Sequence, residues 1–224
     1  MKRNFIYSTV IALLVSSAQC FAASPPMPGM TSGIGDNGMK HAGIGLTGTV
    51  FTVHYDATPA VPLSMISGHG ADYTPDKFQV LEDVYFNAQY GWVPDGFISL
   101  PADRFIWIER TGTIQPANSM FKVYEAGNGS MIPGEGMMNW TMNEIYSSNG
   151  EIWQWDGVMQ HDYYTADIPG SYSMSFDVYL GDFSGVQDVS FTPVSTTFEF
   201  VVVPEPTTIA LAILGIVVMV VRRR

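Results

Sequence analysis

The chain has 224 residues, one cysteine, and 21 acidic against 10 basic residues, for a formal net charge of −11. The acidic excess lies in the body of the chain, because residues 24–203 contain five basic and twenty acidic side chains, a net charge of −15. This balance argues against binding to the phosphate backbone of nucleic acids. The only cysteine, Cys20, lies in the segment expected to be removed on export, so the mature chain would have no disulfide, thiolate metal site or cysteine nucleophile.

The N-terminus has the order of a secretory signal peptide. The basic residues Lys2 and Arg3 precede an apolar run over residues 5–15, and a small and polar stretch follows. We therefore expect residues 1–23 to be removed on export. Cys20 leaves a lipoprotein as an alternative, although the residues before it lack the leucine and the small residue of a lipobox.

The C-terminus combines three features within residues 204–224. They are the motif Pro204, Glu205 and Pro206, an apolar run over residues 209–221, and the basic cluster Arg222, Arg223 and Arg224. This arrangement resembles the PEP-CTERM sorting signal, which implies recognition by an exosortase.

The apolar tail is short for a permanent membrane anchor. As a helix, residues 207–221 span about 22 Å, less than the ~30 Å of a hydrocarbon core. The arginines are expected to stay in the cytoplasm, which leaves the body outside the inner membrane. We expect inner-membrane anchoring before processing and then a periplasmic, cell-surface or extracellular-matrix location; an ordinary unprocessed anchor is the alternative.

The body is punctuated by glycine and proline and has no long helical period, which is typical of an all-β domain. We interpret residues 24–40 as a flexible leader and residues 41–203 as a single β-sandwich (Ig-like) domain. The clearest strand is 171–180, where apolar and polar residues alternate. Further strands are predicted at 41–46, 49–55, 80–86, 96–100, 105–109, 121–125, 143–147, 151–155 and 196–203. Hairpin turns are predicted at Thr47-Gly48 and at Ser148-Asn149-Gly150.

Three segments of the body resemble the choice-of-anchor M domains, also described as surface-anchored repeats. They are residues 41–46 with 51–56, residues 73–76 with 92–94, and residues 160–172. The sequence departs from the family pattern at Gly43, where the family has Asp, and at Met159, where a further His is common. The resemblance implies a role in metal handling beside an ABC transporter of the manganese and zinc class.

Three of the four histidines, His41, His54 and His161, fall at the family positions. His41 and His54 are also symmetric about the predicted Thr47-Gly48 turn, which would make them cross-strand neighbours. We expect these three imidazoles to bind one ion, zinc ahead of manganese, with Asp56, Asp162 or water completing its shell. The alternative is structural, with His41 and His54 as a packing pair and His161 capping a turn. His69 is interpreted as an exposed loop residue.

Two other ligand chemistries remain open. Met27, Met30 and Met39 could present thioethers to Cu(I) together with His41. An aromatic group could instead form a sugar-stacking platform on a structural or carbohydrate-binding component of the extracellular polysaccharide matrix; its members are Trp140, Trp153, Trp155, Tyr163 and Tyr164. No nucleophile elbow, phosphate loop or acid-base motif is present, so we expect a binding protein and not an enzyme.

Overall fold

A computed structural model describes residues 28–29, 32–33, 38–73, 76–125, 130–131, 138–139 and 142–204. Pro25–Val203 forms one compact unit with its own hydrophobic core. The predicted signal peptide and the tail from Glu205 onward lie outside the described residues. Within the described ranges, no helix has the length and apolar character needed to cross a membrane.

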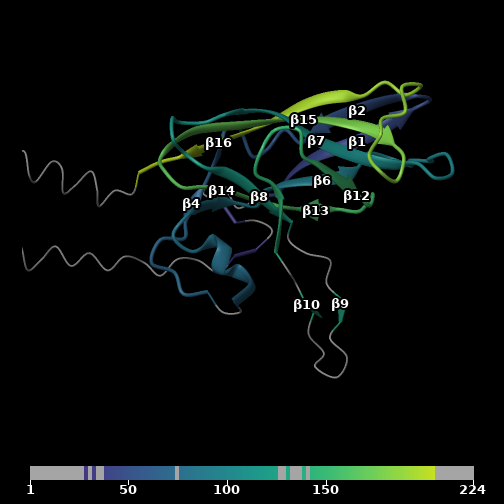
Figure 1. Ribbon diagram of the computed structural model, residues 1–224. Helices are drawn as coiled ribbons and strands as arrows, with labels where there is room; N and C mark the ends of the chain where they lie inside the picture. The colour runs from purple at the N-terminus through teal and green to yellow at the C-terminus, as the bar shows by residue number, and fades with distance from the viewer. Residues whose placement is uncertain are drawn as a thin grey trace, which may run out of the picture. The chain divides into compact units, whose positions relative to one another are not determined.

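In its described residues the unit is built from strands joined by loops and a short 3-10 helix, so the all-β prediction is confirmed (Figure 1). The elements in chain order are β1 (Lys40–Thr47), β2 (Val50–Tyr55), β3 (Leu63–Ser64), β4 (Ile66–Ser67), η1 (Asp76–Leu81), β5 (Tyr85–Asn87), β6 (Tyr90–Pro94), β7 (Phe105–Ile114), β8 (Phe121–Glu125), β9 (Ser130–Met131), β10 (Met138–Asn139), β11 (Asn143–Tyr146), β12 (Ile152–Trp155), β13 (Gln160–His161), β14 (Tyr163–Ala166), β15 (Gly170–Gly181) and β16 (Val194–Val202).

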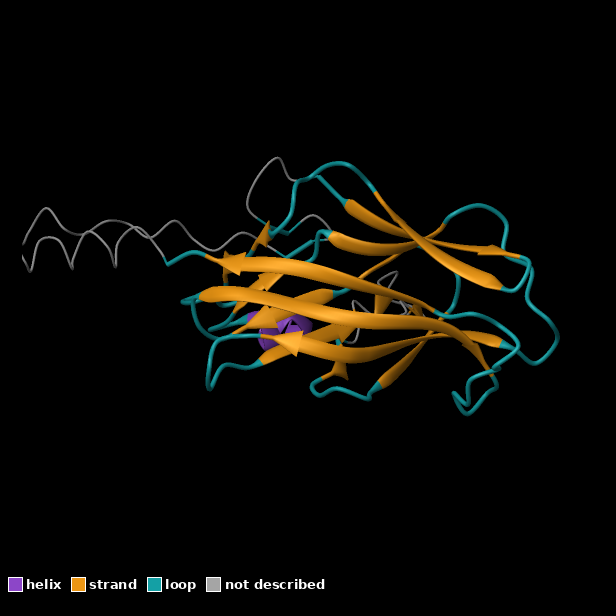
Figure 2. Cartoon of the chain, turned by 90° about the horizontal axis from the view of Figure 1, so that it is seen from above, coloured by secondary structure: helices purple, strands orange, loops and turns teal. Residues whose placement is uncertain are grey.

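The longest strands form one layer, a sheet with the order β12-β7-β15-β16-β3. Its long members run side by side in Figure 2. The alternation predicted for β15 is confirmed, because the side chains of its apolar positions are at most 2% exposed; these are Tyr172, Met174, Phe176, Val178 and Leu180. One face of this sheet is therefore packed on the core.

The other two large sheets have the orders β13-β6-β1-β2 and β11-β8-β14-β5-β4. Two pairs of consecutive strands, β5 with β6 and β13 with β14, connect them at bends. β5 leads into β6 through Ala88 and Gln89, and β13 leads into β14 through Asp162. β13 pairs with β6 while β14 pairs with β5, so the two pairs stay together through the bend.

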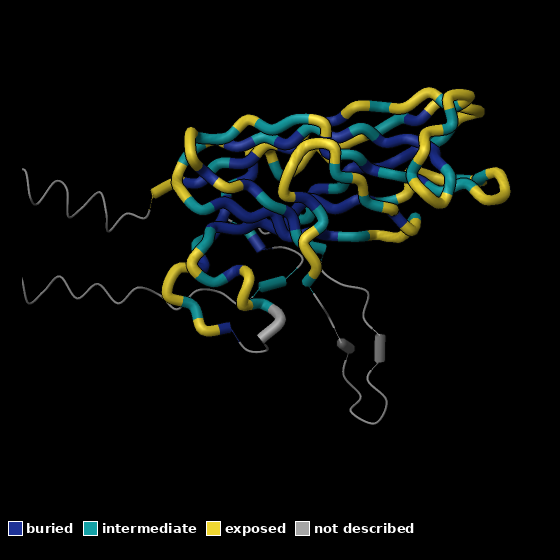
Figure 3. The backbone as a smooth tube through the Cα atoms, viewed as in Figure 1, coloured by how far each residue is buried: buried dark blue, intermediate teal, exposed yellow. Residues whose placement is uncertain are grey.

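The core lies between these layers and is dominated by aromatic rings. Tyr90 of β6 stacks on Phe198 of β16 with centroids 4.0 Å apart and an interplanar angle of 3°. Trp92 meets Phe176 edge to face at 5.5 Å. Figure 3 shows the result, with buried strands between exposed loops at both ends of the unit. This arrangement is consistent with a β-sandwich.

The first hairpin has a different register from the predicted one. Its turn residues are Gly48 and Thr49, with φ of 61° at Gly48, as the first position of a type II′ turn requires. The pairing therefore places Gly43, and not His41, opposite His54. A shift of the turn by one residue moves every cross-strand partner by two.

The predicted hairpin at Ser148-Asn149-Gly150 is also wrong in its pairing. Strands flank the turn as expected, but β11 pairs with β8 and β12 pairs with β7 in the other layer. The turn is held by buried Arg110, whose main-chain carbonyl accepts from the N–H of Gly150 at 2.7 Å. It therefore carries the chain between layers instead of closing a hairpin.

One predicted strand is shortened to its last two residues, which belong to β5, and another is absent. Residues 80–86 begin within η1, and Asp83, with φ of 57°, turns the chain before β5 starts. Residues 96–100 form a loop that connects one layer to the other. In this loop Ile98 and Leu100 pack against the core, so their alternation reflects anchoring of the loop and not a strand.

Candidate metal-binding site

A row of residues from neighbouring strands lies on the outward face of the sheet β13-β6-β1-β2. The register aligns His41 of β1 with Gly91 of β6, and Gly91 with His161 of β13. The next residue of β6, Trp92, is buried in the core, so alternation along the strand directs the row away from the core. Asp56, just after β2, extends the row, because its main-chain N–H donates to the carbonyl of His41 at 3.2 Å.

The His41 ring is oriented by a carboxylate. Its Nδ1 lies 2.7 Å from Oδ2 of Asp56, and the main-chain N–H of His41 donates to the same oxygen at 3.0 Å. The main-chain bond, followed by the ring, holds the pKa of the Asp56 carboxyl below its usual value. A carboxylate can only accept, so Nδ1 of the neutral ring carries the proton and Nε2 carries a lone pair. That Nε2 is buried and has no hydrogen-bond partner in the described part of the chain.

His161 has the same arrangement on the other side of the row. Its Nδ1 donates to the main-chain carbonyl of Ala88, at the bend between β5 and β6, at 2.9 Å. The residue is 2% exposed, and this burial lowers the pKa of the imidazole. Its Nε2 is likewise buried and without a hydrogen-bond partner among the described residues. The protein thus holds both imidazoles through Nδ1, and in their neutral forms each would have an Nε2 lone pair without a partner among the described residues.

The rings of His41 and His161 meet edge to face at a separation that suits a shared ion. Their centroids are 5.6 Å apart and their planes are inclined by 78°. Two imidazoles that bind one ion at ~2.0 Å through nitrogen have centroids roughly 5 to 6 Å apart. A buried acceptor without a partner destabilises the fold by ~1 to 3 kcal/mol. A cation bound to Nε2 of both rings would remove this destabilisation.

Gly91 provides the space in which this pair forms. A Cβ atom built on Gly91 would lie 2.3 Å from Nε2 of His161 and 2.6 Å from Cδ2 and Cε1 of the same ring. The His161 ring therefore lies over the main chain of β6, at the residue that the register aligns with His41 of β1. Any larger residue at this position would displace the ring.

His54 lies on the same face but has its own partner. Its Nδ1 is 2.7 Å from Oδ2 of Asp95, and both side chains are at least half exposed. In the register His54 is opposite Gly43, a position displaced by two residues from His41 along β1. The structure thus brings His41 and His161 into ring contact, while His54 forms a separate pair with Asp95.

The residues expected to complete the shell have different roles. Asp56 accepts a hydrogen bond from Nδ1 of His41, the ring nitrogen that does not face the proposed ion. Such a contact orients a ligating imidazole and raises the basicity of its other nitrogen. Asp162 is 1% exposed, and its charge raises the pKa of Tyr146 and Tyr164 in the core, after the larger effect of burial. Among the described residues there is no group of three or more His, Cys, Asp or Glu side chains placed to hold a metal ion.

The predicted sugar platform does not form from the described rings. Trp155, Tyr163 and Tyr164 are at most 4% exposed and belong to the two hydrophobic clusters. Trp153 is half-buried and bonds to Glu125, and Trp140 lies outside the described residues.

Of the methionines considered for Cu(I), Met27 and Met30 lie outside the described residues, and Met39 is half-buried next to β1. His69 is in a turn, where its ring meets Tyr85 edge to face at 4.9 Å.

Sequence reasoning missed the groups that hold the imidazoles, apart from Asp56. The carbonyl of Ala88 carries no side-chain signal, and the role of Gly91 depends on pairing with two other strands. The dipeptide Gly91-Trp92 was the one available clue, because a glycine beside a core tryptophan in a strand marks a close approach on the opposite face.

Comparison of the chain with family models, with curated proteins and with solved structures finds no match. The resemblance to choice-of-anchor M domains and to PEP-CTERM proteins therefore remains a prediction.

Proposed function

We propose that this chain is an exported surface or periplasmic binding protein that holds a divalent transition-metal ion between His41 and His161. The observation that supports the proposal is the pair of buried Nε2 atoms without partners, each on a ring anchored through Nδ1. Imidazole suits zinc, whereas manganese favours oxygen ligands, so zinc is ahead of manganese as the cargo.

Two protein nitrogens favour transfer of the ion over permanent storage. A structural zinc site is closed by four protein ligands, and a site with fewer leaves positions for water or for a ligand of another molecule. Such an open site suits delivery to a metal ABC transporter, the partner class that the choice-of-anchor M resemblance implies. No catalytic role is proposed.

The location of the protein is a second part of the proposal. The tail with Glu205 and the arginine cluster at residues 222–224 supports sorting by an exosortase, with inner-membrane anchoring before release to the periplasm, cell surface or matrix. Replacing Glu205 by Ala should leave a full-length precursor in membrane fractions; normal processing would contradict sorting by an exosortase.

We also propose that the sandwich is of the immunoglobulin-like class, which the packing of two layers around one core supports.

The metal proposal is tested by calorimetric titration of the compact unit Pro25–Val203 with zinc chloride at pH 7.5. We expect uptake of one ion and a rise in melting temperature with zinc concentration. His41→Ala and His161→Ala should each abolish uptake. Asp56→Asn should keep the site and weaken its affinity by roughly 10- to 100-fold, as loss of an orienting carboxylate does.

His69→Ala is the matched control, because it removes a histidine outside the row and should leave uptake unchanged. His54→Ala separates the two-histidine site from the three-histidine site predicted from the sequence: unchanged affinity supports the pair alone. Uptake by His41→Ala or His161→Ala equal to that of the unaltered protein would refute the site.

A further inference from the structure

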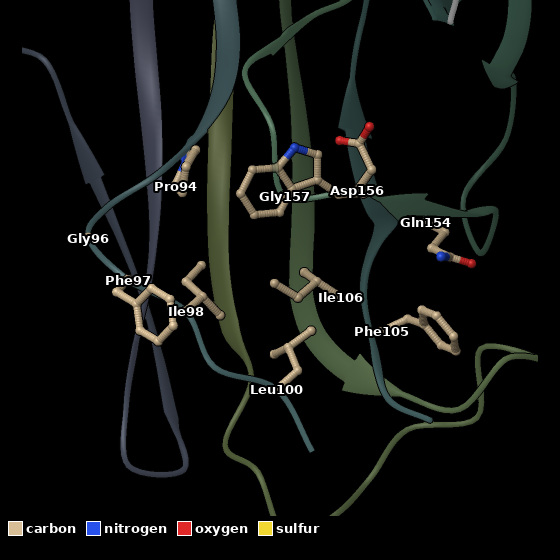
Figure 4. A pocket seen from close by; sticks show the side chains of 11 residues that line it. Pro94, Gly96, Phe97, Ile98, Leu100, Phe105, Ile106, Gln154, Asp156 and Gly157 are labelled. Carbon is tan, nitrogen blue, oxygen red and sulfur yellow. The ribbon is translucent and has the colours of Figure 1, made fainter. Parts of the chain in front are cut away.

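A cleft lies at the opposite end of the unit from Val203, where the loop after β6 crosses to β7. It has a volume of about 560 Å³, within the range of small-ligand sites. Figure 4 shows the labelled residues that line it, which come from the end of β6 and the loop after it, the start of β7, and the end of β12 with the turn that follows. It shares no described lining residue with the histidine row.

An exposed aromatic ring forms one wall of this cleft. Phe97 is 91% exposed, although it follows Gly96 in a loop that is firmly attached. Ile98 and Leu100 of the same loop pack against the core, and Gly96, with φ of 87°, turns the chain before Phe97. The ring is therefore held in solvent by an anchored loop instead of being left on a loose one. A large ring kept exposed beside a cleft indicates a contact with a ligand.

Two polar side chains stand at the same cleft. Gln154 and Asp156 are both exposed and both line it. Oδ1 of Asp156 accepts from the main-chain N–H of Val158 at 3.1 Å, which fixes the carboxylate and leaves Oδ2 available to a ligand. Gly157, with φ of 81°, permits this turn.

The charge of the lining restricts the ligand. Among the described lining residues there is a carboxylate and an amide but no basic side chain, so no cation would offset the repulsion between Asp156 and an anionic ligand. A wholly apolar ligand would cover Gln154 and Asp156 without hydrogen-bonding them, which disfavours binding. An uncharged ligand fits this lining if it has a face of C–H groups for the ring and hydroxyl donors for the carboxylate and the amide.

We propose that the cleft between Phe97 and Asp156 binds a neutral saccharide. One face of a pyranose ring lies on Phe97, whose negative face attracts the partly positive C–H groups. Its hydroxyls donate to Asp156 and exchange hydrogen bonds with Gln154. This site is independent of the metal proposal, and it uses residues other than the aromatic platform predicted from the sequence.

The test is affinity electrophoresis of the Pro25–Val203 unit in native gels that contain soluble neutral polysaccharides: dextran, laminarin, xyloglucan, galactomannan and hydroxyethyl cellulose, with alginate as the anionic counterpart. EDTA is present throughout, which separates the result from zinc binding. We expect retardation by at least one neutral polymer and none by alginate. Phe97→Ala should raise the dissociation constant by about tenfold, the effect of losing one aromatic contact. Asp156→Asn, which removes charge but keeps shape, should weaken binding to a smaller extent.

Phe183→Ala is the matched control, because Phe183 is 82% exposed on another loop and does not line the cleft. Equal losses for Phe97→Ala and Phe183→Ala would show nonspecific apolar adsorption and overturn the proposal. Migration unaffected by all five neutral polymers would overturn it too. Light scattering that shows a dimer lost in Phe97→Ala would assign the cleft to contact between copies and exclude the saccharide site.

Discussion

The two faces of the sheet β13-β6-β1-β2 are built from the same strands and have opposite characters. The inward face presents Ala42, Ile44, Tyr90 and Trp92, all at most 1% exposed and packed in the aromatic core. The outward face presents histidine and glycine at the alternate positions of the row. One face thus holds the layers together, and the other holds two imidazoles in a defined geometry.

The difference shows that residues of the core and residues of the candidate site can alternate along the same strands. His41 and Gly91 each have a core residue as a neighbour in sequence, so a slip of one position along these strands would exchange the two faces. The bend at Ala88 contributes to the outward face, because its main-chain carbonyl accepts a hydrogen bond from Nδ1 of His161. The comparison predicts that substitutions on the two faces have separable effects on folding and on binding.

The largest effect is expected on the inward side. Phe198 is fully buried and stacks on Tyr90, so Phe198→Ala should lower the free energy of unfolding by ~3 to 5 kcal/mol through lost burial and the cavity left behind. Urea denaturation followed by tryptophan fluorescence measures this loss. Phe183→Ala removes a ring that is exposed, and it should stay within about 0.5 kcal/mol of the unaltered protein. Similar losses for both would show that the stacked core does not carry the stability.

An intermediate effect is expected at the row itself. The new methyl group of Gly91→Ala collides with the His161 ring, so we expect a loss of ~1 to 3 kcal/mol in unfolding free energy together with loss of zinc uptake. Denaturation and calorimetry on one preparation measure both quantities.

Gly112→Ala serves as the control for this substitution. Gly112 is also in a strand, but a Cβ atom there would meet Ser175 at an ordinary 3.6 Å. It should change zinc uptake little. Normal zinc uptake by Gly91→Ala would mean that the ring is not confined to the position over β6.

The smallest effect is a pH dependence of stability in the absence of metal. Burial lowers the pKa of His161, so the folded state resists protonation of a group that the unfolded chain protonates near pH ~6.5. The stabilising contribution is therefore complete above that pH and is lost as the pH falls below it. His161→Asn should flatten this dependence in urea denaturation between pH 7.5 and 5. An identical slope in both proteins would show that other groups dominate.

Local patterns in the sequence predicted the local features of this fold. The alternation of β15 and the turn signals identified the all-β class, because periodicity and turn chemistry act within a few residues. Pairing was harder, since the turn at Gly48 is displaced by one residue from its predicted position and the chain after Gly150 changes layer. Both outcomes depend on tertiary packing; the turn at Gly150, for example, is held by the main-chain carbonyl of buried Arg110.

The candidate sites show the same limit. His41 and His161 were singled out as ligands, but their juxtaposition depends on two strands that both pair with β6, and no local pattern encodes that arrangement. The cleft was not predicted at all, because residues 96–100 were interpreted as a strand. Phe97 becomes recognisable as a ligand contact only when its exposure is known.

The position of β16 determines how the domain would respond to mechanical load. The described domain ends directly after this strand, which pairs with β15 over nine antiparallel residue pairs and with β3 on its other side. A force applied at Val203 and directed along the strand would shear the ladder, so its hydrogen bonds would resist together instead of opening one after another. If the protein is tethered through its C-terminal segment, a pull on a ligand held at the far loops would be transmitted along the strongest direction of the sheet.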